Sequence, residues 1–153
     1  MEKKKRIYLT IVVVITLAIL SGVTYLLIQR KNTVNQIEKI VENCAKNKID
    51  NKFISNIDGE KIYYSIQNNW TEEGGINLKK VESYTEKKNW SKKYICLKID
   101  YKGTLNNEQN NEDCEYYKIY FKKNDNGIYI TKVGVSVGET GVYSYEPVSG
   151  IDE

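Results

Sequence analysis

An uninterrupted apolar segment near the N-terminus constrains this chain more than any other feature. Residues 7–28 form a run of 22 residues that contains no charged side chain. A helix rises about 1.5 Å per residue, so this run spans roughly 33 Å, enough for a hydrocarbon core of about 30 Å. The sequence therefore predicts a transmembrane helix over residues 7–28. Its predicted membrane-spanning side chains include Ile7, Ile11, Val14, Leu17, Leu20, Leu26 and Ile28.

A cleaved signal peptide is the main alternative to a retained helix. Signal peptides share the basic start, but their apolar region is about 7–15 residues long and ends at a cleavage site of small residues. Here the small pair Ser21-Gly22 is followed by residues 23–28, which continue the hydrophobic stretch. We therefore expect an uncleaved signal-anchor.

Basic residues are distributed unevenly around the apolar segment. Four precede it, whereas only Arg30 and Lys31 follow it closely. Because cytoplasmic flanks carry the excess of Lys and Arg, residues 1–6 are predicted to be a cytoplasmic tail, and the chain after residue 31 is predicted to lie outside the cell membrane. The topology-determining residues of this tail are Lys3, Lys4, Lys5 and Arg6.

The charge of the remaining chain bounds its partners. The whole chain has 23 basic and 20 acidic residues, of which six basic and one acidic lie in residues 1–31, leaving 17 and 19. A near-neutral domain has no electrostatic footprint for nucleic acid, so we expect no nucleic-acid partner.

Amino-acid usage points to a type of source organism. Lys, Asn, Ile and Tyr are frequent (Tyr occurs 13 times), whereas there is no His and one Pro. Most of the frequent residues have AT-rich codons, which is typical of a low-GC bacterium. Together with the anchor, this usage predicts a bacterial cell-envelope protein.

Two helices are predicted after the anchor. Residues 33–49 place apolar side chains at helical spacing, with Thr33 as a possible cap. Alternatively, this helix continues directly from the membrane helix, since neither Gly nor Pro lies between them. Residues 58–73 form the second predicted helix, with Asp58 as N-cap and Gly74-Gly75 as the stop. The competing interpretation makes residues 61–67 a strand.

The period of the apolar pattern then changes to two, which is typical of strands. A polar loop is predicted over residues 103–113 and a flexible tail over residues 139–153, which leaves an extracytoplasmic domain over residues 33–138. The predicted strands are 76–86, 94–102, 115–123 and 128–137. Ile95, Leu97, Ile99 and Tyr101 should share one face of the second strand. The side chains predicted to be buried in the last two strands are Tyr117, Ile119, Phe121, Tyr129, Val133 and Val135.

This order of elements predicts an α+β fold. The N-terminal transmembrane helix would be followed by two helices packed on a curved four-stranded antiparallel sheet.

Residues 116–133 carry a resemblance to a known family. Many domains of the nuclear transport factor 2-like (NTF2-like, cystatin-like cone) superfamily end in a strand, a glycine-containing turn and Gly-x-Trp-x-Ile. Gly127, Tyr129 and Thr131 occupy that pattern here, with Tyr for Trp and Thr for Ile. The chain thus resembles the membrane-anchored envelope members of this superfamily. The resemblance implies docking or self-association, as in bridge components of conjugation and secretion machines.

The candidate chemistry is sparse. Enzymes of the superfamily place Asp, His or Tyr inside the cone, but this chain has no His and no set that matches theirs. We therefore expect no enzyme activity and no cofactor. The cysteines Cys44, Cys96 and Cys114 are widely spaced and there is no His, so we expect no metal site. A disulfide between two of them is open outside the cell, although the predicted positions of Cys96 and Cys114 fit a cross-strand bond poorly. Cys44 is expected to be a buried free thiol.

Two further groups of residues have competing interpretations. The tyrosines could form a binding surface, although coding bias and strand propensity explain their number more simply. The lysine pairs 79–80, 87–88 and 92–93 could face an anionic polymer or lipid, but interleaved acids favour a solvated mixed-charge face. Asp100 lies within a predicted strand on the same face as Cys96 and Lys98, so Lys98 is a neighbour that could keep it charged and inert.

The sequence therefore favours a non-enzymatic docking or assembly module tethered to the bilayer. Its partners would be envelope proteins or a second copy of the chain. The alternative is a small-ligand pocket inside the cone.

Overall fold

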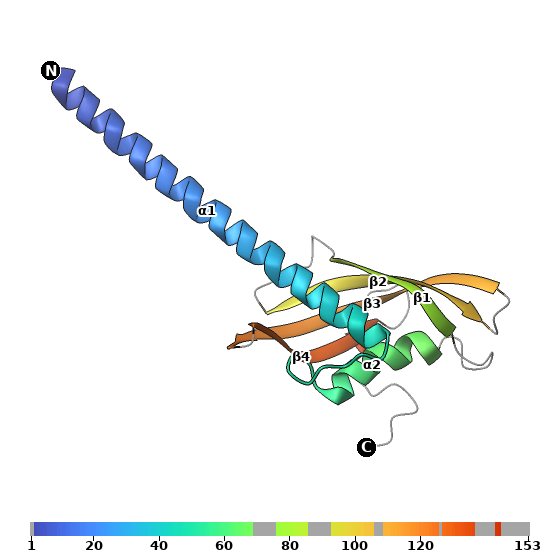
Figure 1. The fold of residues 1–153 in the computed structure, drawn as a ribbon. Coiled ribbons are helices and arrows are strands. Elements are labelled where there is room, and N and C mark those ends of the chain that lie inside the picture. Colours follow the sequence, from blue (N-terminus) through green and yellow to red (C-terminus); the bar gives the residue numbers. More distant parts are fainter. Residues whose placement is uncertain are drawn as a thin grey trace. The chain divides into compact units, whose positions relative to one another are not determined.

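The computed structural model describes residues 2–68, 76–85, 93–105, 109–125, 127–136 and 143–144. The chain divides into two compact units, Met1–Thr33 and Val34–Glu153, which we describe separately. Helix α1 (Glu2–Ala45) passes through both units, and the rest of the second unit comprises one more helix and an antiparallel sheet (Figure 1).

The first unit consists of the N-terminal part of α1. This helix is long and apolar enough to span a membrane, judged by length and composition. All seven predicted membrane-spanning side chains are exposed on it, and none is buried by the rest of the chain. Four hydroxyls within the apolar segment donate hydrogen bonds to backbone carbonyls three or four residues earlier. These bonds reduce the free-energy cost of placing a hydroxyl in an apolar environment. They belong to Thr10, Thr16, Ser21 and Thr24.

Helix α1 is continuous where the sequence left two alternatives. Thr33 is not a cap, because it lies inside the helix and its hydroxyl donates to the carbonyl of Gln29 at 3.0 Å. The helix ends at Ala45, four residues earlier than predicted. Asn47 adopts a left-handed φ of 56°, and the N–H of Lys48 bonds back to the carbonyl of Asn43 at 2.8 Å, the hydrogen-bond pattern of a Schellman motif.

Helix α2 (Asn56–Asn68) begins two residues earlier than predicted. Its cap is Ser55 and not Asp58, because the Ser55 hydroxyl accepts the N–H of Asp58 at 3.1 Å. The competing strand over residues 61–67 is wrong, since these residues are helical. The predicted end of this helix, residues 69–73, and the Gly74-Gly75 stop lie outside the described residues.

The sheet has the order β1-β2-β3-β4-β5, with every neighbouring pair antiparallel. Its strands are β1 (Ile76–Thr85), β2 (Tyr94–Leu105), β3 (Gln109–Asn124), β4 (Gly127–Ser136) and the two-residue β5 (Tyr143–Ser144). The prediction had no strand at β5.

The predicted loop over residues 103–113 is wrong where the structure describes it. Gly103 pairs with Asn111 and Leu105 with Gln109, so β2 and β3 continue through this polar segment as a hairpin. Pairing of the two strands satisfies the backbone hydrogen-bonding groups of this segment. The segment has no alternation of apolar residues, and such alternation was the sequence pattern from which strands were predicted.

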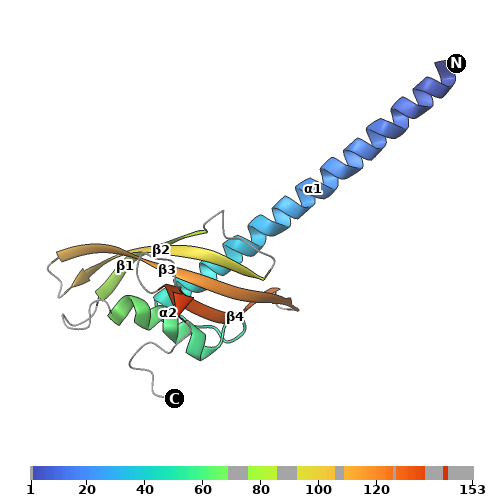
Figure 2. The ribbon, with the colours of Figure 1, turned by 180° about the vertical axis from the view of Figure 1, so that it is seen from behind.

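The α+β fold class is confirmed. Helix α2 covers one face of the sheet, as both views of the ribbon show (Figure 2). The residues of α1 within the second unit contribute Ile37, Val41, Cys44 and Ala45 to the same core. The predicted inward face of β2 is confirmed, with Ile95, Leu97, Ile99 and Tyr101 all buried.

The prediction for β4 is only partly right. Val133 is buried and Val135 packs against the core while partly exposed, but Tyr129 lies on the other face, and Ile128 and Ile130 are buried instead. The register shifts by one residue, because Tyr120 pairs with Lys132 while Phe121 pairs with Ile130. This bulge reverses the alternation along the strand.

Phe121 tests the orientation of β3. It is 8% exposed within the core cluster, whereas its neighbour Lys122 is exposed on the other face. Phe121→Ala should lower the free energy of unfolding of the full chain in micelles by about 3–5 kcal/mol, because it leaves a cavity. The control Lys122→Ala should change it by less than about 0.5 kcal/mol. A loss below about 1 kcal/mol for Phe121→Ala would contradict the inward orientation.

Candidate functional site

The face of the sheet that points away from the helices, here called the outer face, carries lysine, carboxylate and tyrosine side chains. In β2 and β3 the buried residues alternate with residues that point outward. Cys96 is an outward residue: it is 3% exposed, but it does not belong to the core cluster. Two parts of this face differ in character. The charged end comprises Lys80, Glu82, Lys98, Asp100, Lys102 and Glu112, and the Tyr–Lys end comprises Tyr94, Lys118, Tyr120, Lys122 and Tyr129.

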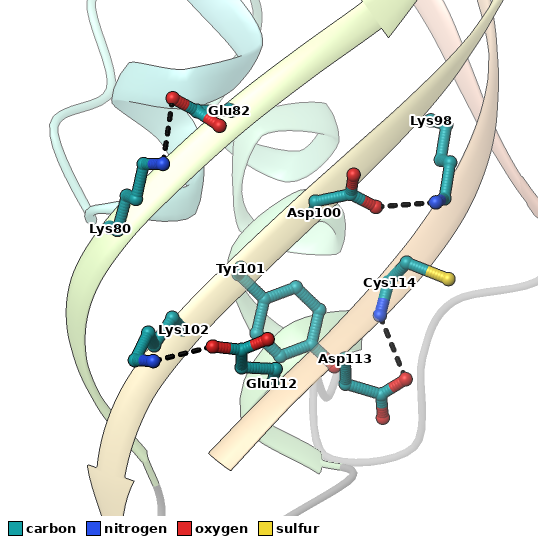
Figure 3. Close-up of a pocket in the computed structure, with 9 residues that line it drawn as sticks. All are labelled: Lys80, Glu82, Lys98, Asp100, Tyr101, Lys102, Glu112, Asp113 and Cys114. Carbon is teal, nitrogen blue, oxygen red and sulfur yellow. Dashed lines mark hydrogen bonds and ion pairs between the residues drawn. The ribbon is translucent and has the colours of Figure 1, made fainter. Parts of the chain in front are cut away.

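The charged end lines an open hollow of about 580 Å³ over β1, β2 and β3 (Figure 3). Lys98 Nζ lies 2.7 Å from Asp100 Oδ1, and Lys80 Nζ lies 3.0 Å from Glu82 Oε1. Lys102 pairs with Glu112 across the two strands of the hairpin. Each of the three lysines of this end therefore contacts a carboxylate.

Two of these pairs shift the pKa of one of their members. The hydrogen bond with Asp100 raises the pKa of Lys98, and the hydrogen bond with Lys102 lowers the pKa of Glu112. Both shifts move away from neutral pH, the opposite of what a general acid or base requires. Asp100, the carboxylate that the sequence analysis singled out, is 43% exposed and is paired with Lys98 as expected. Among the described residues, no group of His, Cys, Asp or Glu could hold a metal ion.

The Tyr–Lys end is built differently. Tyr94 and Tyr120 are opposite each other on β2 and β3, with ring centroids 5.5 Å apart. The ammonium group of Lys118 lies 4.4 Å from the centroid of the Tyr94 ring and 5.5 Å from that of Tyr120. Further along β3, Lys122 lies 5.5 Å from the centroid of the Tyr129 ring. Cation–π contacts of this kind contribute about 0.5–1 kcal/mol each at exposed sites.

The lysines of the two ends therefore differ in what surrounds them. At the charged end each lysine contacts a carboxylate. Within the described part of the chain, Lys118 and Lys122 contact tyrosine rings and form no ion pair. A ring face holds an ammonium group in place but does not cancel its charge. The pKa of Lys118 is raised, mainly by its hydrogen bond with Tyr120, so it stays protonated at neutral pH.

The space between the helices and the sheet is occupied by the core. Ile62 and Ile66 of α2 and Leu97 of β2 are buried there. The polar atoms of this region satisfy each other, since the hydroxyls of Ser65 and Tyr117 lie 2.6 Å apart. Burial raises the pKa of Tyr117 well above its usual value, so the phenol stays neutral.

The three thiols are free in the structure. Cys44 is buried, as predicted, and burial raises its pKa to about 12. A thiol reacts as the thiolate, so Cys44 is inert at neutral pH.

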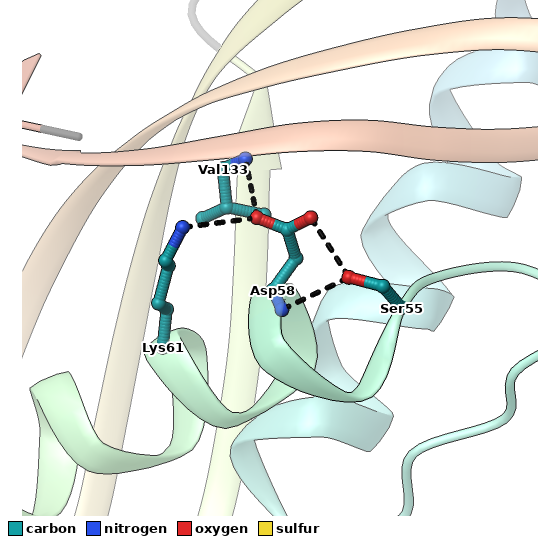
Figure 4. Close-up of polar contacts among 4 residues, drawn as sticks. All are labelled: Ser55, Asp58, Lys61 and Val133. Carbon is teal, nitrogen blue, oxygen red and sulfur yellow. Dashed lines mark hydrogen bonds and ion pairs between the residues drawn. The ribbon is translucent and has the colours of Figure 1, made fainter. Parts of the chain in front are cut away.

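Asp58 joins α2 to β4 through a second polar cluster (Figure 4). Its carboxylate accepts the backbone N–H of Val133 at 3.2 Å, the ammonium group of Lys61 at 3.3 Å and the hydroxyl of Ser55 at 2.9 Å. The side chains of Asp58 and Lys61 are only 14% and 13% exposed. Three residues before Val133 on β4, the N–H of Ile130 donates a hydrogen bond to the carbonyl of Phe53 at 2.7 Å. The segment before α2 and its first turn thus cover the part of β4 that is not paired with β5.

Helix side chains also cover both ends of the β1 edge. Glu42 of α1 accepts the N–H and the hydroxyl of Ser83 at 3.0 and 2.8 Å. The side-chain amide of Gln67 bonds to both the N–H and the carbonyl of Ile76 at 3.1 Å, as a neighbouring strand would. Exposed edges invite pairing with other chains, and these contacts reduce that exposure.

The two groups of predicted site residues are all on α1. Lys4, Lys5 and Arg6 are exposed before the apolar segment, and the side chain of Lys3 lies outside the described residues. Of the lysine pairs, 87–88 and Lys92 also lie outside them. The sequence analysis missed the Tyr–Lys end. The alternation of Tyr116, Lys118 and Tyr120 opposite the core was a signal for it, but the contact with Tyr94 depends on the register of β2 and β3.

Comparison with protein-family models, with curated proteins and with solved structures finds no match to this chain.

Asp58 offers a test of the α2–β4 junction. Asp58→Ala should lower the free energy of unfolding by about 2 kcal/mol, because it leaves the N–H of Val133 without its acceptor. Asp58→Asn retains an acceptor oxygen and should recover more than half of the loss. Urea unfolding of the full chain in micelles measures both variants. Equal losses for the two variants would show that the Val133 bond contributes little.

Proposed function

We propose that this chain is a single-pass envelope protein whose outer domain docks other proteins or assembles with itself. Residues 7–28 act as an uncleaved signal-anchor, residues 1–6 stay in the cytoplasm and the second unit lies outside the cell membrane. The domain works as a binding module without a catalytic centre of its own.

The membrane part of the proposal is supported by α1. One helix near the N-terminus is long and apolar enough to cross a bilayer, and its apolar side chains are exposed. Exposed Ile, Leu and Val over such a length are unfavourable in water and favourable in lipid. The excess of basic residues before the segment supports the cytoplasmic location of the N-terminus.

The docking proposal is carried by the difference between the two faces of the sheet. The side chains of the inner face are buried in the core. The outer face instead carries half-buried tyrosines together with lysines. Tyrosine is enriched at protein interfaces because it combines apolar area with a hydroxyl. Helix side chains cover parts of the edge strand β1 and of β4 where β5 does not pair with it, so the outer face is the better surface for a partner.

The alternative function, a small-ligand pocket inside the cone, has no observation in its favour. The described residues of the interior pack against one another, and the hollow described above lies on the outer face, where its lining includes three ion pairs. Membership of the NTF2-like superfamily stays a prediction.

The anchor and its orientation are tested together in protoplasts of the producing bacterium. Protease added to intact protoplasts should digest the second unit, because it lies outside, and mass spectrometry of the untreated protein should find Met1 or Glu2 at its N-terminus. Full protection from protease would reverse the topology. A mature N-terminus between residues 22 and 30 would contradict the anchor.

Docking is tested by the size of the native particle. The full chain, extracted from its own membrane in a mild detergent, should elute as a complex that contains a second protein or a second copy. A chain that elutes only as a monomer in its micelle, from cells in which it is expressed at its natural level, would contradict the docking function.

A further inference from the structure

We infer that the Tyr–Lys end of the outer face docks an acidic surface of a partner protein. This inference rests on the proposed docking function and specifies its surface and the chemistry of its partner. The uncompensated charges of two lysines and the exposed areas of the tyrosines around them carry it.

Charge is the first argument. Between residues 116 and 122 of β3, the outer face carries Lys118 and Lys122 and no aspartate or glutamate. Within the described chain, Lys118 and Lys122 have tyrosine rings and no carboxylate beside them. The charged end of the same face shows the opposite arrangement, with each of its lysines in an ion pair. Positive potential is therefore concentrated at one end of the face, where it is complementary to a carboxylate-rich surface.

Preorganisation is the second argument. A lysine side chain loses conformational entropy when a partner immobilises it, and this loss weakens exposed ion pairs. Lys118 is already held over Tyr94 and Tyr120, and Lys122 is held near Tyr129. Part of the entropy has thus been lost before a partner arrives. A carboxylate that binds here meets ammonium groups that are already in place.

The tyrosines distinguish a protein from other anionic partners. Clusters of about four to eight basic residues are typical of attraction to anionic lipid, whereas the outer face carries Lys118, Lys122 and Lys132 at this end. A phosphate polymer would use the charges but would offer no apolar surface to the rings. An acidic protein surface uses both, since tyrosines at the centre of an interface bury large areas and rim charges direct association.

The test uses the full chain in nanodiscs of phosphatidylcholine. The probe is a synthetic copolymer of glutamate and tyrosine, a defined model of an acidic polypeptide, and its binding is measured by thermophoresis at about 0.15 M salt, where the Debye length is about 8 Å. Inorganic polyphosphate and vesicles of phosphatidylglycerol are measured in parallel. The copolymer should bind, and it should bind more tightly than either comparison probe.

The variants separate position from net charge. Lys118→Gln with Lys122→Gln should weaken copolymer binding about tenfold, as expected for the loss of two favourable charge contacts. Lys80→Gln with Lys102→Gln removes the same net charge from the charged end and should change binding by less than about twofold, because screening limits its reach. Lys118→Arg with Lys122→Arg should retain binding. Thermal melting of each variant checks that the fold is intact.

Several outcomes would overturn the inference. Copolymer binding that is absent, or that survives Lys118→Gln with Lys122→Gln, would exclude this end as the docking surface. An equal loss in the control variant would show a general charge effect. Tighter binding of polyphosphate or of the vesicles would identify another class of partner. If the copolymer result fails while native complexes are found, docking stands and uses another surface; if both fail, the proposed function fails with it.

Discussion

Burial of one face of the sheet is the constraint on which the other features of the second unit depend. The inner side chains of β2 and β3, such as Ile99 and Ile119, have no exposure at all, because α2 and the end of α1 pack against them. Since strand side chains alternate, fixing this face also fixes the opposite set, which brings Tyr94, Lys118 and Tyr120 together. The outer face is therefore a consequence of the core, and its composition determines what the domain can bind.

The helices also shape the sheet edges through polar contacts. Glu42 and Asp58 each place a half-buried carboxylate against a backbone N–H, on the edge strand β1 and on the part of β4 that β5 does not pair. Charge-assisted bonds of this kind are stronger than neutral ones and satisfy donors that would otherwise attract another strand. The same residues thus stabilise the packing of the helices and reduce the exposure of the sheet to pairing with another strand.

The sequence predicted most of the fold because its strongest signals are local. The apolar segment, the alternation in β2 and the turn before Gly127 all depend on neighbouring residues, and each has its counterpart in the structure. The predictions are wrong where the pairing of strands determines which side chains are buried. Because of the bulge in β4, Ile128 and Ile130 are buried and Tyr129 lies on the outer face. The position of this bulge follows from the register of β4 with β3, which the sequence pattern of β4 alone does not show. The Tyr–Lys end was missed for the same reason, since Tyr94 lies far from Lys118 in the chain.

The Tyr–Lys end is the surface at which we propose that a partner contacts this protein. Photo-crosslinking in the native membrane tests this most directly, with a photoreactive amino acid at position 120 in one variant and at position 102, at the charged end of the same face, in another. The account predicts an adduct with one protein from position 120 and little or none from position 102. Equal adducts from both positions, or adducts from position 102 alone, would contradict it.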